Sequence, residues 1–323
     1  MSESKDEPKG KNRWNWLRPQ FGKIAYAKWE WVVMRALFAW YCILPTTLPS
    51  APLATKTQPA PNGIAQFFDL TFLAGDGAFN VLQWVVPIFL IVYVVGFLPF
   101  LATTVLFSIH VGLSTLANSQ GAIHHTGQVV GYALLGQMIC HIYRWAKYLL
   151  GKQSLRESAA TLHRDQIYFT QQAMAAAYVI AGLSKIINSG FQWVATIPNM
   201  VLQLEKNYGM HYHNNLKEPP GRGTEFAADL IINYPTLAKI LLTGGLLLEL
   251  LCFLALWNRL FLAVFGASLI AMHMFISSAM NLGFAYNKAA LFIFYVNAPF
   301  IAFAIFRHFS GLGKNGPELS KSS

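Results

Sequence analysis

The chain contains repeated apolar runs of about 20 residues that carry no charged side chain. Runs of this length match the hydrocarbon core of a bilayer and exceed most buried helices of soluble proteins. We therefore expect an all-α fold, a polytopic integral membrane bundle. The runs predict about eight transmembrane helices, at 29–48, 81–101, 102–118, 126–143, 168–186, 235–256, 260–280 and 288–306.

Two of these predicted helices are nearly continuous in sequence, and only Pro99 separates them. Proline removes a backbone donor and clashes with the preceding turn, so we place the break there. The composition agrees with a membrane class, because charged residues make up 12% of the chain and hydrophobic residues 54%.

The sequence suggests three regions: a basic cytoplasmic arm at 1–28, a transmembrane domain at 29–306 and a short cytoplasmic tail at 307–323. The arm shows no signal-peptide pattern, so the first apolar run is expected to stay as an anchor. Its tryptophans, Trp14 and Trp16, stand among cations, as in a segment that lies on an anionic lipid surface. We read the net charge of +10 as a sign of membrane topology, and we expect no nucleic-acid partner.

The distribution of cations predicts the topology. With both termini in the cytoplasm, the inner segments hold most lysines and arginines, including Arg144, Lys147, Lys152 and Arg259. The outer segments would be two long loops, 49–80 and 187–234, and a tight turn that contains His124 and His125. The host membrane is a plasma membrane for a bacterial chain and the endoplasmic reticulum for a eukaryotic one.

Ionisable residues inside the predicted spans are the first candidates for a site, because charge at that depth usually faces a partner or a cavity. Arg35, Glu249 and His273 are three such residues. Arg35 and Glu249 would form a structural ion pair or share a polar network, and the alternative is a direct catalytic role for either residue. We expect no metal site, because the two histidines of the Met210–His213 stretch, which alternate as on a strand, have no third ligand nearby.

Lys185 stands near the end of the predicted helix 168–186 and has two interpretations. It could snorkel, with its methylenes along lipid and its ammonium among the headgroups. It could instead face a polar cavity, where desolvation favours a neutral amine that can act as a base.

An ordered set of residues resembles a known family. The set consists of Arg35, His124/His125, an A-G-x-x-K motif ending at Lys185 with Trp193 downstream, L-x-E ending at Glu249, and His273 followed by L-G-x-F at 282–284. In this order they resemble the horizontally transferred transmembrane (HTTM) domain family, related to the membrane domain of the vitamin K-dependent gamma-carboxylase. The resemblance covers roughly residues 30–300.

The resemblance implies a lysine-base enzyme with a quinone-type pocket at the outer face of the membrane. Lys185 would be the base, His124 or His125 would tune it, and Trp193 and His273 would contact the cofactor. That cofactor would be reduced vitamin K or another quinol, used with O2 and CO2. The carboxylases often have a second lysine where this chain has Ser184, and they present glutamates on a large lumenal region that these outer loops are too short to replace.

Two other functions stay open. One is a non-enzymatic membrane partner for the maturation or export of a secreted peptide. The other is a transporter or a lipid-binding bundle, although the sequence shows no internal repeat of the kind that many transporters have.

Overall fold

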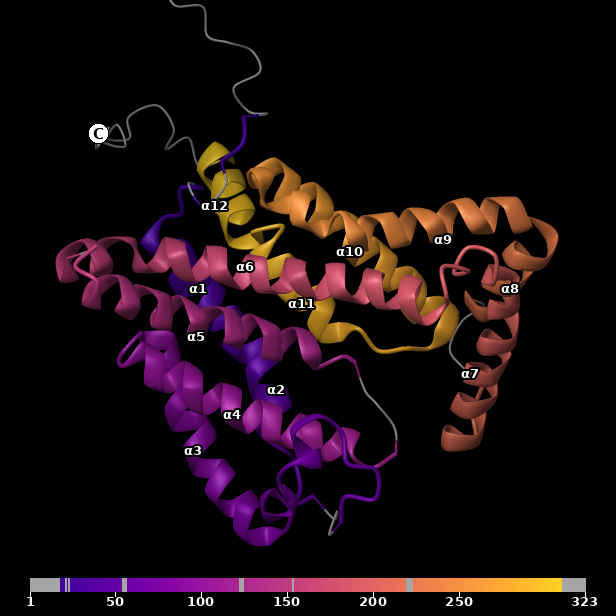
Figure 1. The fold of residues 1–323 in the computed structure, drawn as a ribbon, viewed down its shortest axis with the longest axis horizontal. Coiled ribbons are helices and arrows are strands. Elements are labelled where there is room, and N and C mark those ends of the chain that lie inside the picture. The colour runs from indigo at the N-terminus through magenta and orange to yellow at the C-terminus, as the bar shows by residue number, and fades with distance from the viewer. Residues whose placement is uncertain are drawn as a thin grey trace, which may run out of the picture.

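The computed structural model describes residues 18–20, 22, 24–53, 57–121, 125–152, 154–218 and 223–309. The described part contains helices and no strands, so the expected all-α fold is confirmed (Figure 1). The helices are α1 (Lys28–Phe38), α2 (Leu44–Thr47), α3 (Asp76–Val95), α4 (Pro99–Asn118), α5 (Gln128–Leu149), α6 (Leu155–Asn188), α7 (Met200–Asn215), α8 (Gly223–Asn233), α9 (Pro235–Leu250), α10 (Arg259–Met280), α11 (Ala285–Phe294) and α12 (Ala298–Phe309).

Three described helices, α3, α4 and α10, are long and apolar enough to cross a membrane. The bent pair of α8 and α9 adds a fourth if it counts as one span, although its two helices meet at an angle of 116°. On α3, one helical face leaves large apolar side chains exposed, as expected for contact with lipid. These side chains are Val81, Trp84, Ile88, Ile91 and Val95.

The prediction of eight spans is therefore wrong, and the reasons are local. The segment predicted as 29–48 contains a π-helical turn at Ala39–Ile43. The segment predicted as 288–306 is divided at Asn297, whose φ of 55° ends one helix before the next begins. Helix α9 is only 16 residues long and continues as a 3-10 helix, Cys252–Trp257.

Two further predicted spans belong to helices of a more polar kind. Helix α6 extends over 34 residues, and its first turns carry charged and amide side chains. Helix α5 buries Gln137 and Arg144. Arg144 donates to the Asp165 carboxylate of α6, so these two helices are joined by polar contacts near the turn that connects them.

The predicted break at Pro99 is confirmed. Helix α3 ends at Val95, Gly96 follows in the left-handed region with a φ of 81°, and Pro99 begins α4. Arg35 lies against this turn, and its Nη1 donates to the Tyr93 carbonyl oxygen at 3.0 Å. A guanidinium at the C-terminal end of a helix also complements the helix dipole.

The two long segments expected as outer loops contain more helix than predicted. Residues 187–234 include α7 and α8, and the pair His211 and His213 lies on α7 and not on a strand. Residues 49–80 include two short 3-10 turns, Gly63–Gln66 and Thr71–Leu73, and the first turn of α3.

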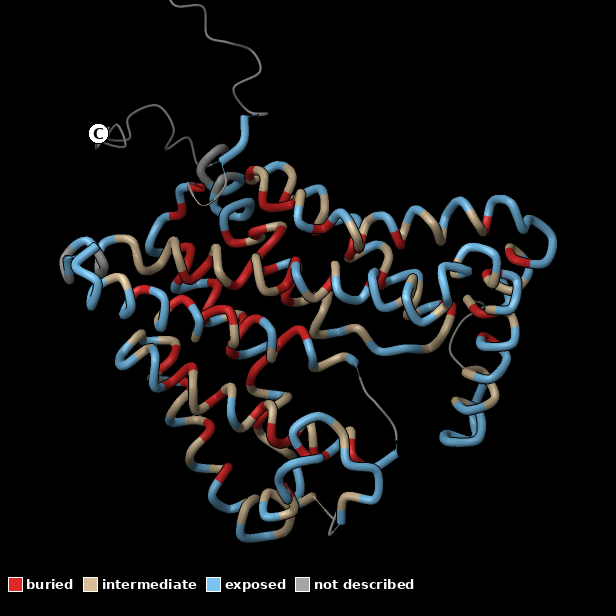
Figure 2. The backbone as a smooth tube through the Cα atoms, viewed as in Figure 1, coloured by how far each residue is buried: buried red, intermediate tan, exposed pale blue. Residues whose placement is uncertain are grey.

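Buried residues are concentrated where α1, α5, α6 and α11 meet, while α3 and α9 show long exposed stretches (Figure 2). Helices α5 and α6 lie side by side along much of their length. They approach closely at Gly136, where an added Cβ would lie 2.6 Å from the Phe169 carbonyl oxygen. Small residues at such contacts let membrane helices approach closely.

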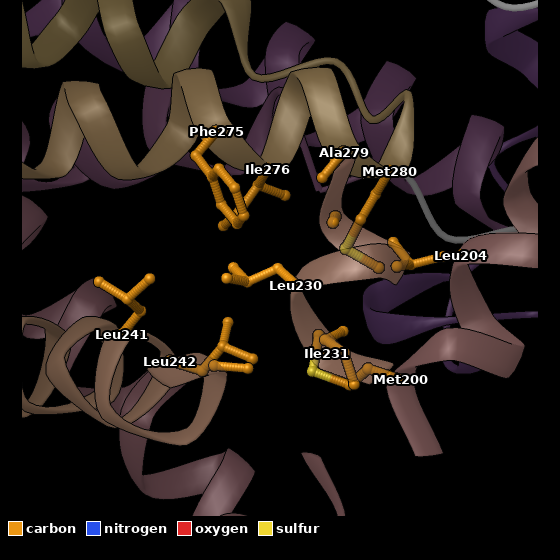
Figure 3. Close-up of a pocket in the computed structure, with 12 residues that line it drawn as sticks. Met200, Leu204, Leu230, Ile231, Leu241, Leu242, Phe275, Ile276, Ala279 and Met280 are labelled. Carbon is orange, nitrogen blue, oxygen red and sulfur yellow. The ribbon is translucent and has the colours of Figure 1, made fainter. Parts of the chain in front are cut away.

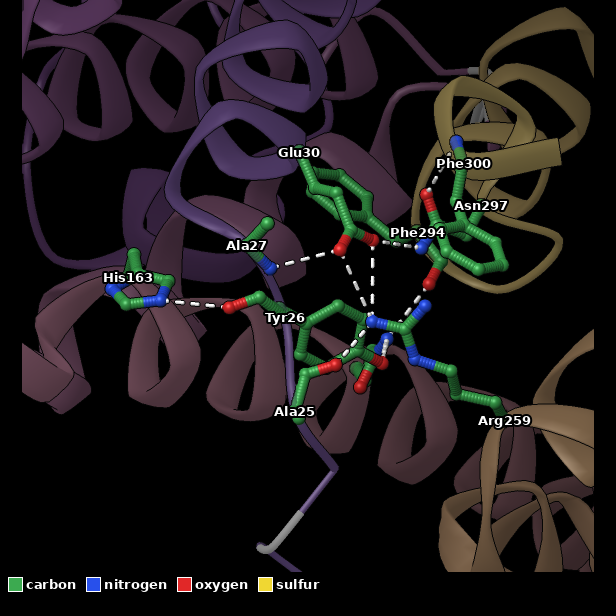
Figure 4. Close-up of polar contacts among 10 residues, drawn as sticks. Ala25, Tyr26, Ala27, Glu30, His163, Arg259, Phe294, Asn297 and Phe300 are labelled. Atoms are coloured by element: carbon green, nitrogen blue, oxygen red, sulfur yellow. Dashed lines mark hydrogen bonds and ion pairs between the residues drawn. The ribbon is translucent and has the colours of Figure 1, made fainter. Parts of the chain in front are cut away.

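A polar network closes the end of the bundle that carries the N-terminal segment (Figure 4). Arg259, at the start of α10, donates to the Ala25 carbonyl oxygen and to the Glu30 carboxylate, and Asn297 donates to the same carboxylate at 2.7 Å. His163 of α6 hydrogen-bonds the Tyr26 carbonyl oxygen. Burial raises the pKa of the Tyr26 phenol to about 12, so this group stays neutral.

Candidate functional site

Lys185 lies on the last turn of α6 and donates to both carboxylate oxygens of Glu249 on α9. The Glu249 side chain is 6% exposed and the Lys185 side chain 35% exposed, so the carboxylate is buried while the amine side is partly open. The Lys185 Nζ also lies 5.8 Å from the centroid of the Trp193 ring, within the range of a cation–π contact. The amine therefore has protein partners and does not simply extend into headgroups.

Gly182 allows this ion pair to form, because it lets α6 and α9 approach. A Cβ at Gly182 would lie 3.0 Å from Cγ and Cδ2 of Leu250, the residue after Glu249. Gly182 is one turn before Lys185 and faces the same way. The glycine and the lysine of the A-G-x-x-K motif thus act together. Gly182 leaves room for α9 to pack closely against α6, and Lys185 binds the Glu249 carboxylate of α9.

A second polar contact lies on the same face of α6, about two turns before Lys185. The Tyr178 hydroxyl and His273 Nε2, on α10, are 2.8 Å apart, and both residues are buried. Phe284 stacks on the His273 ring, with centroids 4.6 Å apart and planes 25° apart. The ring of His273 is therefore fixed on two sides.

His273 keeps one ring nitrogen for a ligand. Its Nδ1 is buried and has no hydrogen-bond partner among the described residues. Whichever nitrogen carries the proton, Tyr178 engages Nε2, so Nδ1 remains as an unpaired donor or acceptor. An unsatisfied buried polar atom is costly, and such atoms often mark a functional site.

The two contacts lie on one face of α6, two turns apart, and we call their residues the Lys185 cluster: Lys185, Glu249, Tyr178 and His273. Their side chains come from α6, α9 and α10, so three helices must be in place before the cluster exists. Chemically, the group can exchange protons and can hydrogen-bond a small polar head.

Comparisons with protein-family models, with curated proteins and with solved structures found no match. The function must therefore be argued from the chemistry of the cluster, and the family resemblance stays a prediction from the ordered residues.

The predicted site residues are only partly brought together. Lys185, Trp193 and His273 gather in or beside the cluster, as expected for one site. His125 is exposed in the turn before α5, and no hydrogen bond or ion pair joins it to the cluster in the described part of the chain. His124 lies outside the described residues.

The predicted Arg35–Glu249 pair is wrong. Glu249 binds Lys185, and Arg35 serves the end of α3, with its guanidinium 5.5 Å from the Trp31 ring centroid. Both residues are buried and polar as expected, but they have different partners. The sequence analysis missed Tyr178, although its spacing of seven residues before Lys185 places it on the same helical face.

Two cavities stand out in the described part of the chain, and no residue of the Lys185 cluster lines either of them. The first is enclosed by α7, α8, α9 and α10, and its side chains, including Leu230, Leu242, Phe275 and Met280, point toward one another (Figure 3). Its lining is almost wholly hydrocarbon and thioether, so it offers no polar recognition. The second cavity is larger and more polar.

Proposed function

We propose that the chain is a membrane enzyme in which Lys185 accepts a proton from a hydroxyl of a quinol-type ligand held beside Trp193 and His273. One observation supports this most. Two polar contacts meet the same face of α6: the Lys185–Glu249 pair, and His273 of α10, whose Nδ1 has no hydrogen-bond partner among the described residues. The aromatic rings of Trp193 and Phe284 and the free imidazole nitrogen fit a flat ring that bears hydroxyl groups.

The ion pair is the resting state of such a base. To accept a proton, Lys185 must first pass one to Glu249, which converts the ammonium and carboxylate into a neutral amine and a carboxylic acid. A ligand that excludes water from the pair favours this transfer, because low-dielectric surroundings penalise two separate charges more than two neutral groups. Glu249 thus stores the proton, and Lys185 becomes free to take another from the ligand.

His273 and Trp193 would orient the ligand. The His273 Nδ1 can hydrogen-bond an oxygen of the ring, and the Tyr178 hydroxyl holds the imidazole in place. When bound, a quinol with O2 and CO2 would supply the chemistry that the resemblance to the carboxylases implies.

Replacing Lys185 with arginine tests the base role. Arginine keeps the positive charge and can bind Glu249, but it stays protonated at any working pH. We expect Lys185→Arg to keep its folding and its quinol binding and to lose quinol-dependent oxygen uptake by about 100-fold or more. The measurements are oxygen consumption in reconstituted vesicles and native mass spectrometry with added quinol.

The matched control is Lys206→Arg, at an exposed lysine of α7, which should leave both readouts unchanged. Full oxygen uptake by Lys185→Arg, or a wild-type protein that binds no quinol, would contradict the enzyme proposal. In either case a binding or assembly role, for example with a secreted peptide, would be the better account.

The orientation proposed for the chain places both termini in the cytoplasm. The support comes from one end of the bundle, where hydrogen bonds join the N-terminal segment to the start of α10 and to α6. This end also carries the cations of the α5–α6 turn and Arg259, as the positive-inside rule expects. The Lys185 cluster would then lie toward the outer face.

Cysteine labelling tests this orientation without changes to the native cysteines, because Cys42, Cys140 and Cys252 are all buried. A membrane-impermeant maleimide applied to intact cells should modify Gln120→Cys, at the end of α4, and should spare Lys152→Cys, in the α5–α6 turn. Both positions are exposed. The opposite labelling pattern would invert the proposed topology.

A further inference from the structure

The larger of the two cavities, with a volume of about 270 Å³, lies on the far side of the 284–287 segment from the Lys185 cluster. Its walls come from the end of α2, the last turns of α4, the first turn of α5 and Tyr286 of α11. Because Phe284 contacts His273 while Tyr286 lines the cavity, this short segment separates two distinct sites.

Six of the twelve residues that line this cavity carry a hydroxyl or amide group, and the lining carries no charge. None of its twelve lining residues is acidic, basic or a histidine. The hydroxyl- and amide-bearing side chains are Thr46, Ser114, Asn118, Thr126, Gln128 and Tyr286, and the others are apolar or glycine. A charged ligand would find no counter-ion among these residues, whereas their hydroxyl and amide groups suit an uncharged polar head.

His110 hydrogen-bonds two of the lining residues, Gly127 and Thr46, and so determines which of their groups can donate or accept. Its side chain is 2% exposed, and its Nε2 lies 3.0 Å from the Gly127 carbonyl oxygen, which can only accept. Nε2 therefore carries a proton. The other nitrogen, Nδ1, lies 3.1 Å from the Thr46 hydroxyl oxygen, so the imidazole links α2 to the start of α5.

To a ligand, the Thr46 hydroxyl can therefore offer only an acceptor. Its hydrogen has protein acceptors, the Cys42 carbonyl oxygen at 2.7 Å and the His110 Nδ1 at 3.1 Å. With the hydrogen engaged inside the protein, a lone pair of the oxygen remains for a ligand. The complementary group on the ligand is a hydroxyl donor.

We infer that this cavity binds an uncharged amphiphile with a hydroxyl-bearing head, such as a monoacylglycerol. Its hydroxyl donates to Thr46, and its acyl chain packs on Pro45, Leu53 and Leu113. This inference does not depend on the proposed function of the Lys185 cluster. It assigns a second binding site to the same end of the bundle.

The test uses the full-length detergent-purified protein and measures the affinity for three probes: monooleoylglycerol, its dimethyl ether and oleate. We expect monooleoylglycerol to bind about tenfold more tightly than the ether, which cannot donate, and more tightly than oleate, which is charged. Thr46→Val should abolish the preference for the free hydroxyls. Ser114→Leu should fill the cavity and weaken the binding of every probe.

Ser108→Leu is the matched control, because it makes the same change on an exposed position of α4 outside the cavity. It should bind the probes like the wild type. Wild-type protein that binds no monooleoylglycerol, or binds oleate or the ether equally well, would overturn the inference. So would a Ser114→Leu variant that is folded by its melting curve and keeps the wild-type affinity.

Discussion

The Lys185→Met variant is expected to lose about 3 kcal/mol of unfolding free energy, the lower end of the range for a broken buried ion pair. The reason is Glu249, whose carboxylate is 6% exposed and would stay behind without its counter-ion. The lower end applies because Lys185 is 35% exposed, so water already screens part of the attraction. The measurement is the apparent melting temperature in detergent, supported by denaturant unfolding.

A double-mutant cycle separates the ion pair from simple side-chain loss. Adding Glu249→Gln to Lys185→Met should restore part of the stability, because it removes the orphaned charge. Lys206→Met, at an exposed lysine, should change the melting temperature little. If the two site substitutions are additive, or if Lys185→Met melts like the wild type, the ion pair contributes nothing to stability.

The Gly136→Ala variant is expected to lose about 3 kcal/mol, at the upper end of the range for overpacking. The added methyl would lie 2.6 Å from the Phe169 carbonyl oxygen and 2.9 Å from the Ala173 Cβ. The first obstacle is backbone and cannot rotate away, so α5 and α6 would have to separate. Expression level and melting temperature are the measurements.

The same substitution at Gly244 is the control. This glycine also lies within a helix, α9, but nothing lies within 4 Å of its added Cβ. Gly244→Ala should therefore be neutral or stabilise by up to about 1 kcal/mol, since alanine is the better helix former. Similar losses at Gly136 and Gly244 would mean that the α5–α6 contact is not the cause.

The helices themselves could be predicted from the sequence better than their membrane role. Pro99 marks its boundary directly, because a proline determines its own backbone. The breaks at Ala39–Ile43 and Asn297 are marked less directly, because the nearest following prolines, Pro45 and Pro299, each stand two residues beyond them. They arise where packing against other helices outweighs local preference, which hydropathy does not record.

The candidate site, like the helices, could be predicted from the sequence only in part. The spacing of Lys185 and Trp193 and the placement of His273 inside an apolar run predicted residues that do come together. The partner of Glu249 could not be predicted, because Lys185 and Arg35 were both eligible cations. Two features determine that Lys185 is the partner. Gly182 lets α9 pack closely against α6, and the Tyr93 carbonyl oxygen at the end of α3 accepts a hydrogen bond from Arg35.

Glu30 has a consequence for the order in which the protein is made. Its buried carboxylate is served by Arg259 and Asn297, which are 229 and 267 positions further along the chain. At ribosomal speeds of about 5–20 residues per second, roughly 10–50 seconds pass between the synthesis of Glu30 and that of these partners. Until then the Ala27 N–H, 2.8 Å from Oε1, is the local hydrogen-bond donor to Glu30. The first helix can therefore make its final contacts only when the last helices have been made, and chains that stop short of α10 lack the Arg259 and Asn297 contacts of this carboxylate.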